Sequence, residues 1–486
     1  MKLWHKKSLQ EVYASTAHVG DAWENRQSKI DMRSNFPNDR RLVLVEVLKD
    51  QYKSISSSER VNQNIENLLL PNCYTITTGQ QIVVGLGPWM IFFKIASTIA
   101  LVKKYKAEYP HLKFVPIFWM ATEDHDWQEI AQIQNGNKKS SWSTTQTGAV
   151  GRMSSNEVSD ALQAWNAEFP ADAIAERWLD IYSSSATLSE ATRRLVDSYF
   201  GEFGLVVIDP DDLRLKNMAM PIFRDDAENQ SLYKVATSLG VQTGEIEIKN
   251  CNLFSLENHG RVRLNPDDFN ELALRAPGNL SPNVALRILY QEYVLPNVVY
   301  VGGPSEQRYW RQVMACMQEM GLPHCSFALR ERGAVIPEKM LAKWLEKGLS
   351  ESEWNWTEKQ LKEYFLSHWG PMPLQELSAQ IEVLYQNHTE DIRAEDPTLL
   401  ATWEGELKKA LSGIEQMKGK IDRVRKRKDA ETMQWVEKWI EAVWPGNALQ
   451  ERKNYWLIAD NKKAIPIKEW LETVDPMDPS FKIWTY

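Results

Sequence analysis

The cluster Glu123, Asp124, His125 and Asp126 contains the residues of this sequence that are best suited to acid–base chemistry. His125 beside carboxylates could transfer a proton near neutral pH, Asp124 could orient a substrate amine, and Glu123 is a further catalytic candidate. Adjacent side chains cannot all face one point, so at most two of them should converge. The spacing is not typical of a metal site. The simpler alternative is that Thr122 or Asp124 caps a helix.

A second polar cluster, Thr78, Gly79, Gln80 and Gln81, is a candidate for substrate binding. It offers hydroxyl, amide and backbone donors, and its glycine lets a ligand approach the backbone closely. A helix starting after Pro88 could direct its positive end toward an anion. The pattern is neither a Walker loop nor a dinucleotide fingerprint. The alternative is a tight turn between a strand and a helix.

The third cluster is rich in glycine and contains Gly302, Gly303 and Glu306, directly after an apolar run. Flexible backbone at this point could approach a ligand. Glu306 could hold a substrate ammonium group, or it could simply favour the positive end of the helix that follows.

The remaining candidates for substrate binding lie on predicted helices and strands. Asn283 and Arg287 are four residues apart, so they share a helix face and could bind a carboxylate or form a surface pair. Lys94 lies in an apolar helix, where a buried lysine needs a partner. Trp119 precedes the acidic cluster, and Tyr309 could belong to a pocket or to the core.

A parallel sheet is predicted to position these clusters. The stretch 74–126 reads as strand, loop, helix and strand, which is a βαβ unit. Apolar strands precede the polar clusters 78–81, 123–126, 209–212 and 302–306, and in a doubly wound sheet all four clusters would lie at one edge, where ligands bind. The sequence therefore predicts an α/β fold with an enzyme site. Residues 1–70 should be mainly helical, 127–149 should form a loop or short hairpin, and short strands are expected around 245–248 and 261–264.

The C-terminal third is predicted to be helical. From Leu400 to Val424 apolar residues recur at steps of three and four among many charges. One helix running from Pro397 to Trp444, with Leu374–Ile392 as its antiparallel partner, would form a coiled coil.

Composition excludes several classes of protein. The chain has 486 residues, 43% hydrophobic and 25% charged, so it can form a large core. A net charge of −8 argues against sequence-blind nucleic-acid binding. The cysteines are scattered, which predicts buried, reduced thiols and a cytoplasmic location. The basic N-terminus lacks the apolar segment of a secretory signal, and the apolar run Ile82–Phe93 is too short to span a membrane.

The order of several motifs resembles the BshC family, which is assigned to the cysteine-ligase step of bacillithiol biosynthesis. The resemblance runs along nearly the whole chain. The matching residues are Ile76–Gln81, Gly87, Pro88, Lys94, Val115–Asp126, Asn283, Arg287, Tyr290, Gln291, Pro296, Tyr300–Pro304, Glu306, Tyr309, Trp310 and Leu449–Arg452. The loop after Gln81 departs from the family pattern, because Val83 replaces a glycine and Leu86 replaces a threonine.

The resemblance implies a Rossmann-like core related to class I tRNA synthetases, with connecting-peptide insertions. On this basis the core would span 1–370 with insertions near 127–200 and 225–280, an antiparallel coiled coil would span 371–445, and 446–486 would pack back on the core. The coiled coil would support a homodimer. The implied reaction joins L-cysteine to glucosaminyl-malate in the last step of the pathway.

Amide formation from a free carboxylate usually passes through an activated acyl group, so ATP or ADP with Mg²⁺ is a candidate participant. The sequence leaves open whether ATP is consumed, and neither a tightly bound cofactor nor a resident metal is expected. The resemblance implies nucleotide contacts by Gln450, Arg452 and Asn454, although no KMSKS-like lysine motif is present. Two alternatives stay open. One is another class I nucleotidyltransferase-like amino-acid ligase, and the other is a non-catalytic coiled-coil scaffold protein.

Overall fold

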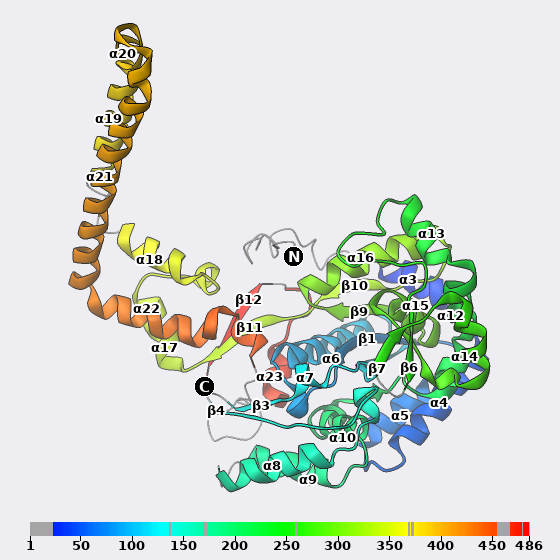
Figure 1. The fold of residues 1–486 in the computed structure, drawn as a ribbon. Coiled ribbons are helices and arrows are strands. Elements are labelled where there is room, and N and C mark those ends of the chain that lie inside the picture. The colour runs from blue at the N-terminus through cyan, green and yellow to red at the C-terminus, as the bar shows by residue number, and fades with distance from the viewer. Residues whose placement is uncertain are drawn as a thin grey trace. The chain divides into compact units, whose positions relative to one another are not determined.

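The computed structural model describes residues 23–135, 138–168, 173–257, 260–367, 370, 374–453, 467–478 and 480–485. The chain divides into two compact units (Figure 1). The first extends to Gly333 and also contains Glu451–Lys482, and the second contains Ala334–Gln450 and Ile483–Thr485. The resemblance implied that the core extends to residue 370, whereas here residues 334–370 group with the helical hairpin.

The first unit is built on a five-stranded sheet with the strand order β10-β9-β1-β2-β5. All of its strand pairs are parallel, which confirms the predicted α/β core. The short strand β10 was not predicted, because a buried run of four residues gives little periodicity. The strands are β1 (Cys73–Gln81), β2 (Lys113–Ala121), β5 (Val206–Ile208), β9 (Asn297–Gly302) and β10 (Ser326–Leu329).

The predicted βαβ unit is present as β1, helix α6 (Met90–Glu108) and β2. Strand β1 lies at the centre of the sheet and is buried along most of its length, which explains its nearly continuous apolar and threonine-rich sequence. Its register pairs Gly79 with Trp119. A side chain at Gly79 would place its Cβ 3.0 Å from the Trp119 carbonyl oxygen, which is a tight contact, so this close approach of the strand ends favours glycine.

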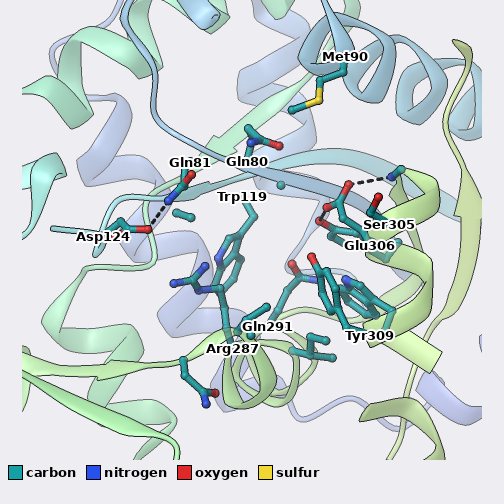
Figure 2. A pocket seen from close by; sticks show the side chains of 18 of the residues that line it. Gln80, Gln81, Met90, Trp119, Asp124, Arg287, Gln291, Ser305, Glu306 and Tyr309 are labelled. Atoms are coloured by element: carbon teal, nitrogen blue, oxygen red, sulfur yellow. Dashed lines mark hydrogen bonds between the residues drawn. The ribbon is translucent and has the colours of Figure 1, made fainter. Parts of the chain in front are cut away.

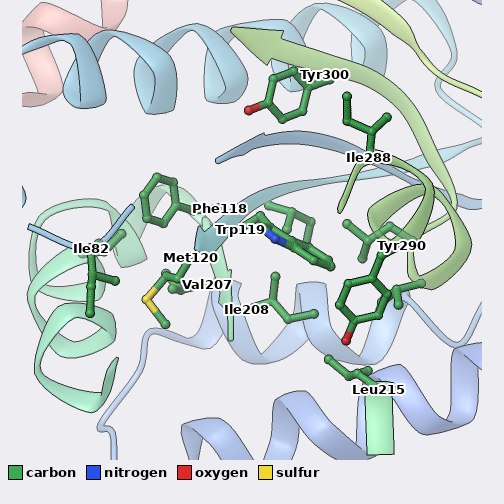
Figure 3. Packing of buried hydrophobic residues seen from close by; sticks show 14 of the residues in the cluster. Ile82, Phe118, Trp119, Met120, Val207, Ile208, Leu215, Ile288, Tyr290 and Tyr300 are labelled. Carbon is green, nitrogen blue, oxygen red and sulfur yellow. The ribbon is translucent and has the colours of Figure 1, made fainter. Parts of the chain in front are cut away.

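The core beside the sheet packs Trp119 against residues from several elements (Figure 3). The ring of Trp119 meets the ring of Tyr290 edge to face, with 5.4 Å between centroids. Ile208 and Leu215 belong to the same buried cluster. This packing fixes Trp119, whose position matters for the site described below.

Helices surround this sheet. The first three confirm the predicted helical start within the described residues, and β3 with β4 confirms the predicted hairpin. In chain order the elements are α3 (Arg26–Arg33), α4 (Asn38–Tyr52), α5 (Glu59–Asn67), α7 (Trp127–Ile130), β3 (Gln132–Asn135), β4 (Lys138–Ser141), α8 (Asn156–Glu168), α9 (Ala173–Ser183), α10 (Leu188–Phe200), α11 (Leu213–Met218), α12 (Met220–Arg224), α13 (Ser231–Ser238), α14 (Phe269–Arg275), α15 (Val284–Val294), α16 (Pro304–Glu319) and α23 (Ile467–Thr473).

An antiparallel sheet of three strands, β6 (Leu253–Glu257), β7 (Gly260–Arg263) and β8 (Leu280–Pro282), is inserted before α15. Strand β7 confirms the strand predicted around 261–264. The strand predicted around 245–248 was wrong. There the side chain of Gln312 accepts from the backbone N–H of Ile246 and donates to its carbonyl oxygen, so these groups need no neighbouring strand.

The second unit contains a helical hairpin in which α19 and α20 pack against α21. Tyr385 stacks on Trp403 across this hairpin, with ring centroids 4.3 Å apart. The predicted single helix to Trp444 was wrong, because Asp429 leaves the helical conformation and its carboxylate accepts from the backbone N–H of Thr432. The elements are α17 (Glu338–Glu346), α18 (Glu358–Ser367), α19 (Gln375–Asn387), α20 (Thr389–Glu395), α21 (Leu400–Lys428) and α22 (Ala430–Val443).

Strands β11 (Arg332–Ile336) and β12 (Phe481–Thr485) pair with each other. Among the helices that the structure describes, none is both long enough and apolar enough to cross a membrane.

Candidate active site

A cavity of about 520 Å³ opens at the carboxyl ends of β1, β2 and β9 (Figure 2). β1 continues through α6 to β2 on one side and pairs with the much later β9 on the other, so the cavity lies where the strand order reverses, as ligand sites in open α/β sheets do. The candidate residues that line it are Gly79, Gln80, Gln81, Trp119, Asp124, Asn283, Arg287, Gly303, Glu306, Tyr309 and Arg452.

Asp124 presents a charged carboxylate at one side of the cavity. Its Oδ2 accepts from the side-chain amide of Gln81, and its Oδ1 accepts from the backbone N–H of His125 at 2.8 Å. Burial disfavours the charge, but these hydrogen bonds, with Arg261 and Arg287 nearby, outweigh burial and hold the pKa of Asp124 below its usual value. Asp124 is therefore ionised at neutral pH and suited to bind a cationic group.

The other residues of the acidic cluster face elsewhere. The ring of His125 is half exposed, with Nδ1 3.5 Å from Asp124 Oδ1, and it does not line the cavity. Asp126, rather than Thr122 or Asp124, caps the short helix α7 by accepting from the backbone N–H of Glu129. The alternative of a helix cap is thus correct for the cluster but was assigned to the wrong residues.

Glu123 is fully buried away from the cavity. Lys216 lies 2.9 Å from Glu123 and 2.5 Å from Asp211, and Arg152 makes two hydrogen bonds to Asp211. Burial raises the pKa of Glu123, and the charge of Lys216 opposes this rise. Two carboxylates and two cations thus balance one another, and this network holds the loop that carries Asp124.

Two more candidates are enclosed within the wall of the cavity. The hydroxyl of Thr78 donates to the carbonyl oxygen of Val301 at 2.7 Å, and the carbonyl of Gly302 accepts from the backbone N–H of Arg330. Neither residue lines the cavity. Their contacts join β1 to β9 and β9 to the segment after β10.

Glu306 occupies the opposite side of the cavity from Asp124 (Figure 2). Its carboxylate accepts from the Tyr300 hydroxyl at 3.1 Å and from the Gly303 backbone N–H at 2.8 Å. It also forms an ion pair with the ammonium group of Lys94, 2.7 Å away. Lys94 itself is buried behind the wall, and burial lowers its pKa despite the nearby carboxylate. A buried Lys94 was predicted to need a partner, and that partner is Glu306.

Several buried side-chain donors of the lining have no hydrogen-bond partner among the described residues. They include Nε1 of Trp119, Nε of Arg287 and Nε2 of Gln291. Leaving a buried donor unpaired costs about 1–3 kcal/mol. Such donors in a cavity indicate a ligand with acceptor oxygens, for example a carboxylate.

Sequence reasoning missed Gln291 and the positive residue Arg261. Gln291 lies four residues after Arg287, so the helical repeat could have identified it. Arg261 stacks over Phe254 with 4.3 Å from its guanidinium to the ring centroid, and both line the cavity. Burial and the neighbouring Arg287 lower the pKa of Arg261 to about 10. No local pattern in the inserted sheet indicates that it would cover the cavity.

Asn283 has a structural task in addition to its place in the lining. Its side-chain oxygen accepts from the backbone N–H groups of Ala285 and Leu286, which caps α15, and its nitrogen donates to Asn252. Asn283 precedes the helix, so the prediction that it shares a helical face with Arg287 was wrong. Asn283 instead fixes the start of the helix that carries Arg287.

The three predicted nucleotide contacts have different positions. Arg452 lines the cavity. Gln450 is buried in the second unit, where it exchanges hydrogen bonds with the backbone of Val335. Asn454 lies outside the described residues. The N–H of Trp89, at the start of α6, donates to the carbonyl of Lys453, so this group does not face an anion.

Other features of the chain lie apart from the cavity. The altered loop turns Leu86 into the core, with a φ of 66°. The cysteines Cys73, Cys251, Cys316 and Cys325 are buried and free. Within the described residues no group of three or more histidine, cysteine, aspartate or glutamate side chains could hold a metal ion.

Comparison with known proteins agrees with this architecture. The family described as "Bacillithiol biosynthesis BshC, N-terminal Rossmann-like domain" matches residues 3–331, and "Bacillithiol biosynthesis BshC, C-terminal coiled-coil domain" matches residues 334–486. Proteins named "Putative cysteine ligase BshC" from Flavobacterium johnsoniae and Cytophaga hutchinsonii are each 30% identical to this chain over 95% of its length, covering 93% and 91% of their own. One from Christiangramia forsetii is 28% identical over 100% of this chain and 96% of its own. The chain belongs to the BshC family of bacillithiol biosynthesis.

Proposed function

We propose that this protein is a ligase that forms an amide between the carboxyl group of L-cysteine and the amino group of glucosaminyl-malate, the last step of bacillithiol formation. The observation that carries this proposal is the polarity of the cavity. Unpartnered donors on Trp119, Arg287 and Gln291 share one cavity with the ionised carboxylate of Asp124. Both substrates carry carboxylate and amino groups, so they match donors and acceptors of this kind.

The donor side of the cavity suits a carboxylate of the malate group. Arg287 provides a positive charge, and Trp119 and Gln291 provide neutral N–H groups in a buried setting. Hydrogen bonds to a charged partner contribute about 1.5–3 kcal/mol each, more than neutral ones. A carboxylate here would accept hydrogen bonds from these unpaired donors.

The acceptor side suits an amine. Asp124 uses its oxygens for Gln81 and His125, yet a carboxylate can accept further hydrogen bonds. Because its pKa lies below the usual value, Asp124 binds an ammonium group well but is a weak base. We assign the removal of the amine proton to His125, reached through a water or a shift of its exposed ring. The lone pair of the neutral amine then attacks the activated cysteine carboxyl carbon, the leaving group departs with the bonding pair, and the nitrogen releases its second proton to water.

Activation of the cysteine carboxyl group by ATP with Mg²⁺ is part of the proposal. Arg452, one of the three predicted nucleotide contacts, lines the cavity, and a guanidinium matches a phosphate group. Gln450 has its side chain committed to Val335 and gives no support for a nucleotide contact.

A cytoplasmic homodimer completes the proposal. Leu377, Val383, Leu384, Met417 and Val424 of the hairpin are between 39% and 60% exposed, which is unusual for large apolar residues placed on two packed helices. A second copy that covers this face would bury them. Sedimentation of the purified protein, with Leu384→Glu as the variant, tests this point.

The decisive experiment is mass spectrometry of reactions with L-cysteine and glucosaminyl-malate, with and without Mg-ATP. We expect bacillithiol only in the complete reaction, and a large loss of product with Asp124→Asn. Serine, alanine and glycine in place of cysteine test for an amino-acid ligase of different specificity. Wild-type protein that forms no product with any of these amino acids would contradict the proposal and favour a scaffold protein.

A further inference from the structure

Lys94 uses its whole hydrogen-bonding capacity inside the protein. An ammonium group has three N–H donors. The Nζ of Lys94 lies 2.9 Å from the carbonyl oxygen of Gly79, 2.8 Å from Oε1 of Gln80 and 2.7 Å from Oε2 of Glu306. The side chain is 2% exposed and does not line the cavity. Lys94 therefore has no donor left for a substrate.

These contacts determine how Gln80 faces the cavity. Because Oε1 of Gln80 accepts from Lys94, the amide NH2 group of Gln80 is directed away from the lysine, and Gln80 lines the cavity. Its neighbour Gln81 has the opposite arrangement, since its NH2 group is the one that the protein engages, by donation to Asp124. Two consecutive glutamines of β1 thus present a donor and an acceptor to the same cavity (Figure 2).

We propose that Lys94 is a positioning residue that orients the Gln80 amide as a hydrogen-bond donor to an acceptor oxygen, carboxylate or hydroxyl, of the substrate. A neutral hydrogen-bonding residue in that place would allow the amide to rotate by half a turn and present its oxygen. The positive charge excludes that orientation, because an NH2 group beside an ammonium would leave donors of both groups unpaired. The effects on KM expected from this inference rest on the proposed function.

The test compares Lys94→Met, Gln80→Glu and the double variant. Gln80→Glu keeps an oxygen for Lys94 but replaces the donor by an acceptor. We expect each single variant to raise KM for glucosaminyl-malate by about tenfold, with a smaller change in kcat, because one hydrogen bond is lost. The double variant should lose no more than Gln80→Glu alone, because both changes remove the same donor. Independent, multiplying effects would overturn the proposal.

Arg33→Met is the matched control for loss of a buried cation. Arg33 pairs with the buried Glu292 and does not line the cavity. The Arg33→Met variant should have a lower melting temperature than the wild type, without a selective rise in KM for glucosaminyl-malate. If Lys94→Met does not fold, Gln80→Met and Gln80→Glu decide the question. Equal rises in KM support the donor role, and a wild-type KM for Gln80→Glu contradicts it.

A crystal structure of Lys94→Met tests the inference even if the wild type forms no bacillithiol and the proposed function fails. The expected result is a Gln80 side chain that is rotated or has several conformations. An unchanged Gln80 in that variant would show that Lys94 does not position it.

Discussion

Glu123 and Asp124 are neighbours in the chain, but their surroundings differ in one respect. Glu123 lies in a closed network whose charges, from Lys216, Asp211 and Arg152, balance within the protein. Asp124 faces a cavity in which donors of Trp119 and Arg287 have no hydrogen-bond partner within the part of the chain that the structure describes. A buried charge that other charges of the fold balance needs no ligand, whereas unpaired donors that line a cavity indicate one. The two regions should therefore respond differently to substitution.

The largest expected effect is on stability, in the closed network. Lys216→Met leaves Glu123 and Asp211 buried without their shared cation, which costs about 3–5 kcal/mol of unfolding free energy. Urea unfolding of the variant and of the wild type measures this loss of unfolding free energy. The double variant Lys216→Met with Glu123→Gln should recover part of the loss, because it removes one of the unpaired charges. A loss below about 1 kcal/mol would mean that the network is not a structural unit.

The next effect concerns activity, in the cavity. Arg287→Met removes a charge that faces the proposed carboxylate, and kcat/KM for glucosaminyl-malate should fall by about 100-fold, or about 2.7 kcal/mol. Stability should change little, because the Nε of Arg287 has no partner to lose among the described residues. Arg287→Lys keeps the charge but not the planar group, so it should restore only part of the activity. An Arg287→Met protein that is unstable but fully active would contradict this prediction, because Arg287 would then stabilise the fold rather than bind the substrate.

The sequence was sufficient to predict that the polar clusters lie at one edge of the sheet. It was not sufficient to predict which of their residues are buried in a charge network and which face the cavity. Apolar strands that end in polar clusters made the common edge predictable, because parallel strands align their carboxyl ends. Nothing local distinguishes Glu123 from Asp124, since Glu123 is held by Lys216 and Asp124 by Gln81, and both partners are distant in the chain. The same holds for Lys94, whose partner Glu306 comes from another strand end. The inserted sheet that carries Arg261 has no sequence signal of its position over the cavity.

Glu331 offers an intermediate case, because it is buried beside Lys482 but keeps a raised pKa. Burial raises this pKa to about 7, and the charge of Lys482 does not fully compensate. Between its usual value of 4.5 and about 7, the folded protein binds the proton more tightly than the unfolded chain does, so stability decreases as pH rises through this window. Glu331→Gln should therefore be about 2 kcal/mol more stable relative to wild type at pH 8 than at pH 4.5.

Urea unfolding at the two pH values measures this difference. Asp478→Asn is a control, because Asp478 lies near Lys482 and adds to the raised pKa of Glu331. It should shift the pH window downward without abolishing it. A difference between Glu331→Gln and wild type that is the same at both pH values would show that Glu331 does not titrate in this range.

The smallest expected effect concerns a partly buried helix cap, in contrast to the fully buried groups above. Asp429 ends α21 and caps α22 through the backbone N–H of Thr432. Since water can partly replace this contact, Asp429→Ala should cost about 1 kcal/mol of unfolding free energy. Asp429→Asn should cost less, because asparagine also caps helices well. If Asp429→Ala instead stabilised the protein, α21 and α22 would favour one continuous helix, and the break would have to come from packing rather than from the cap.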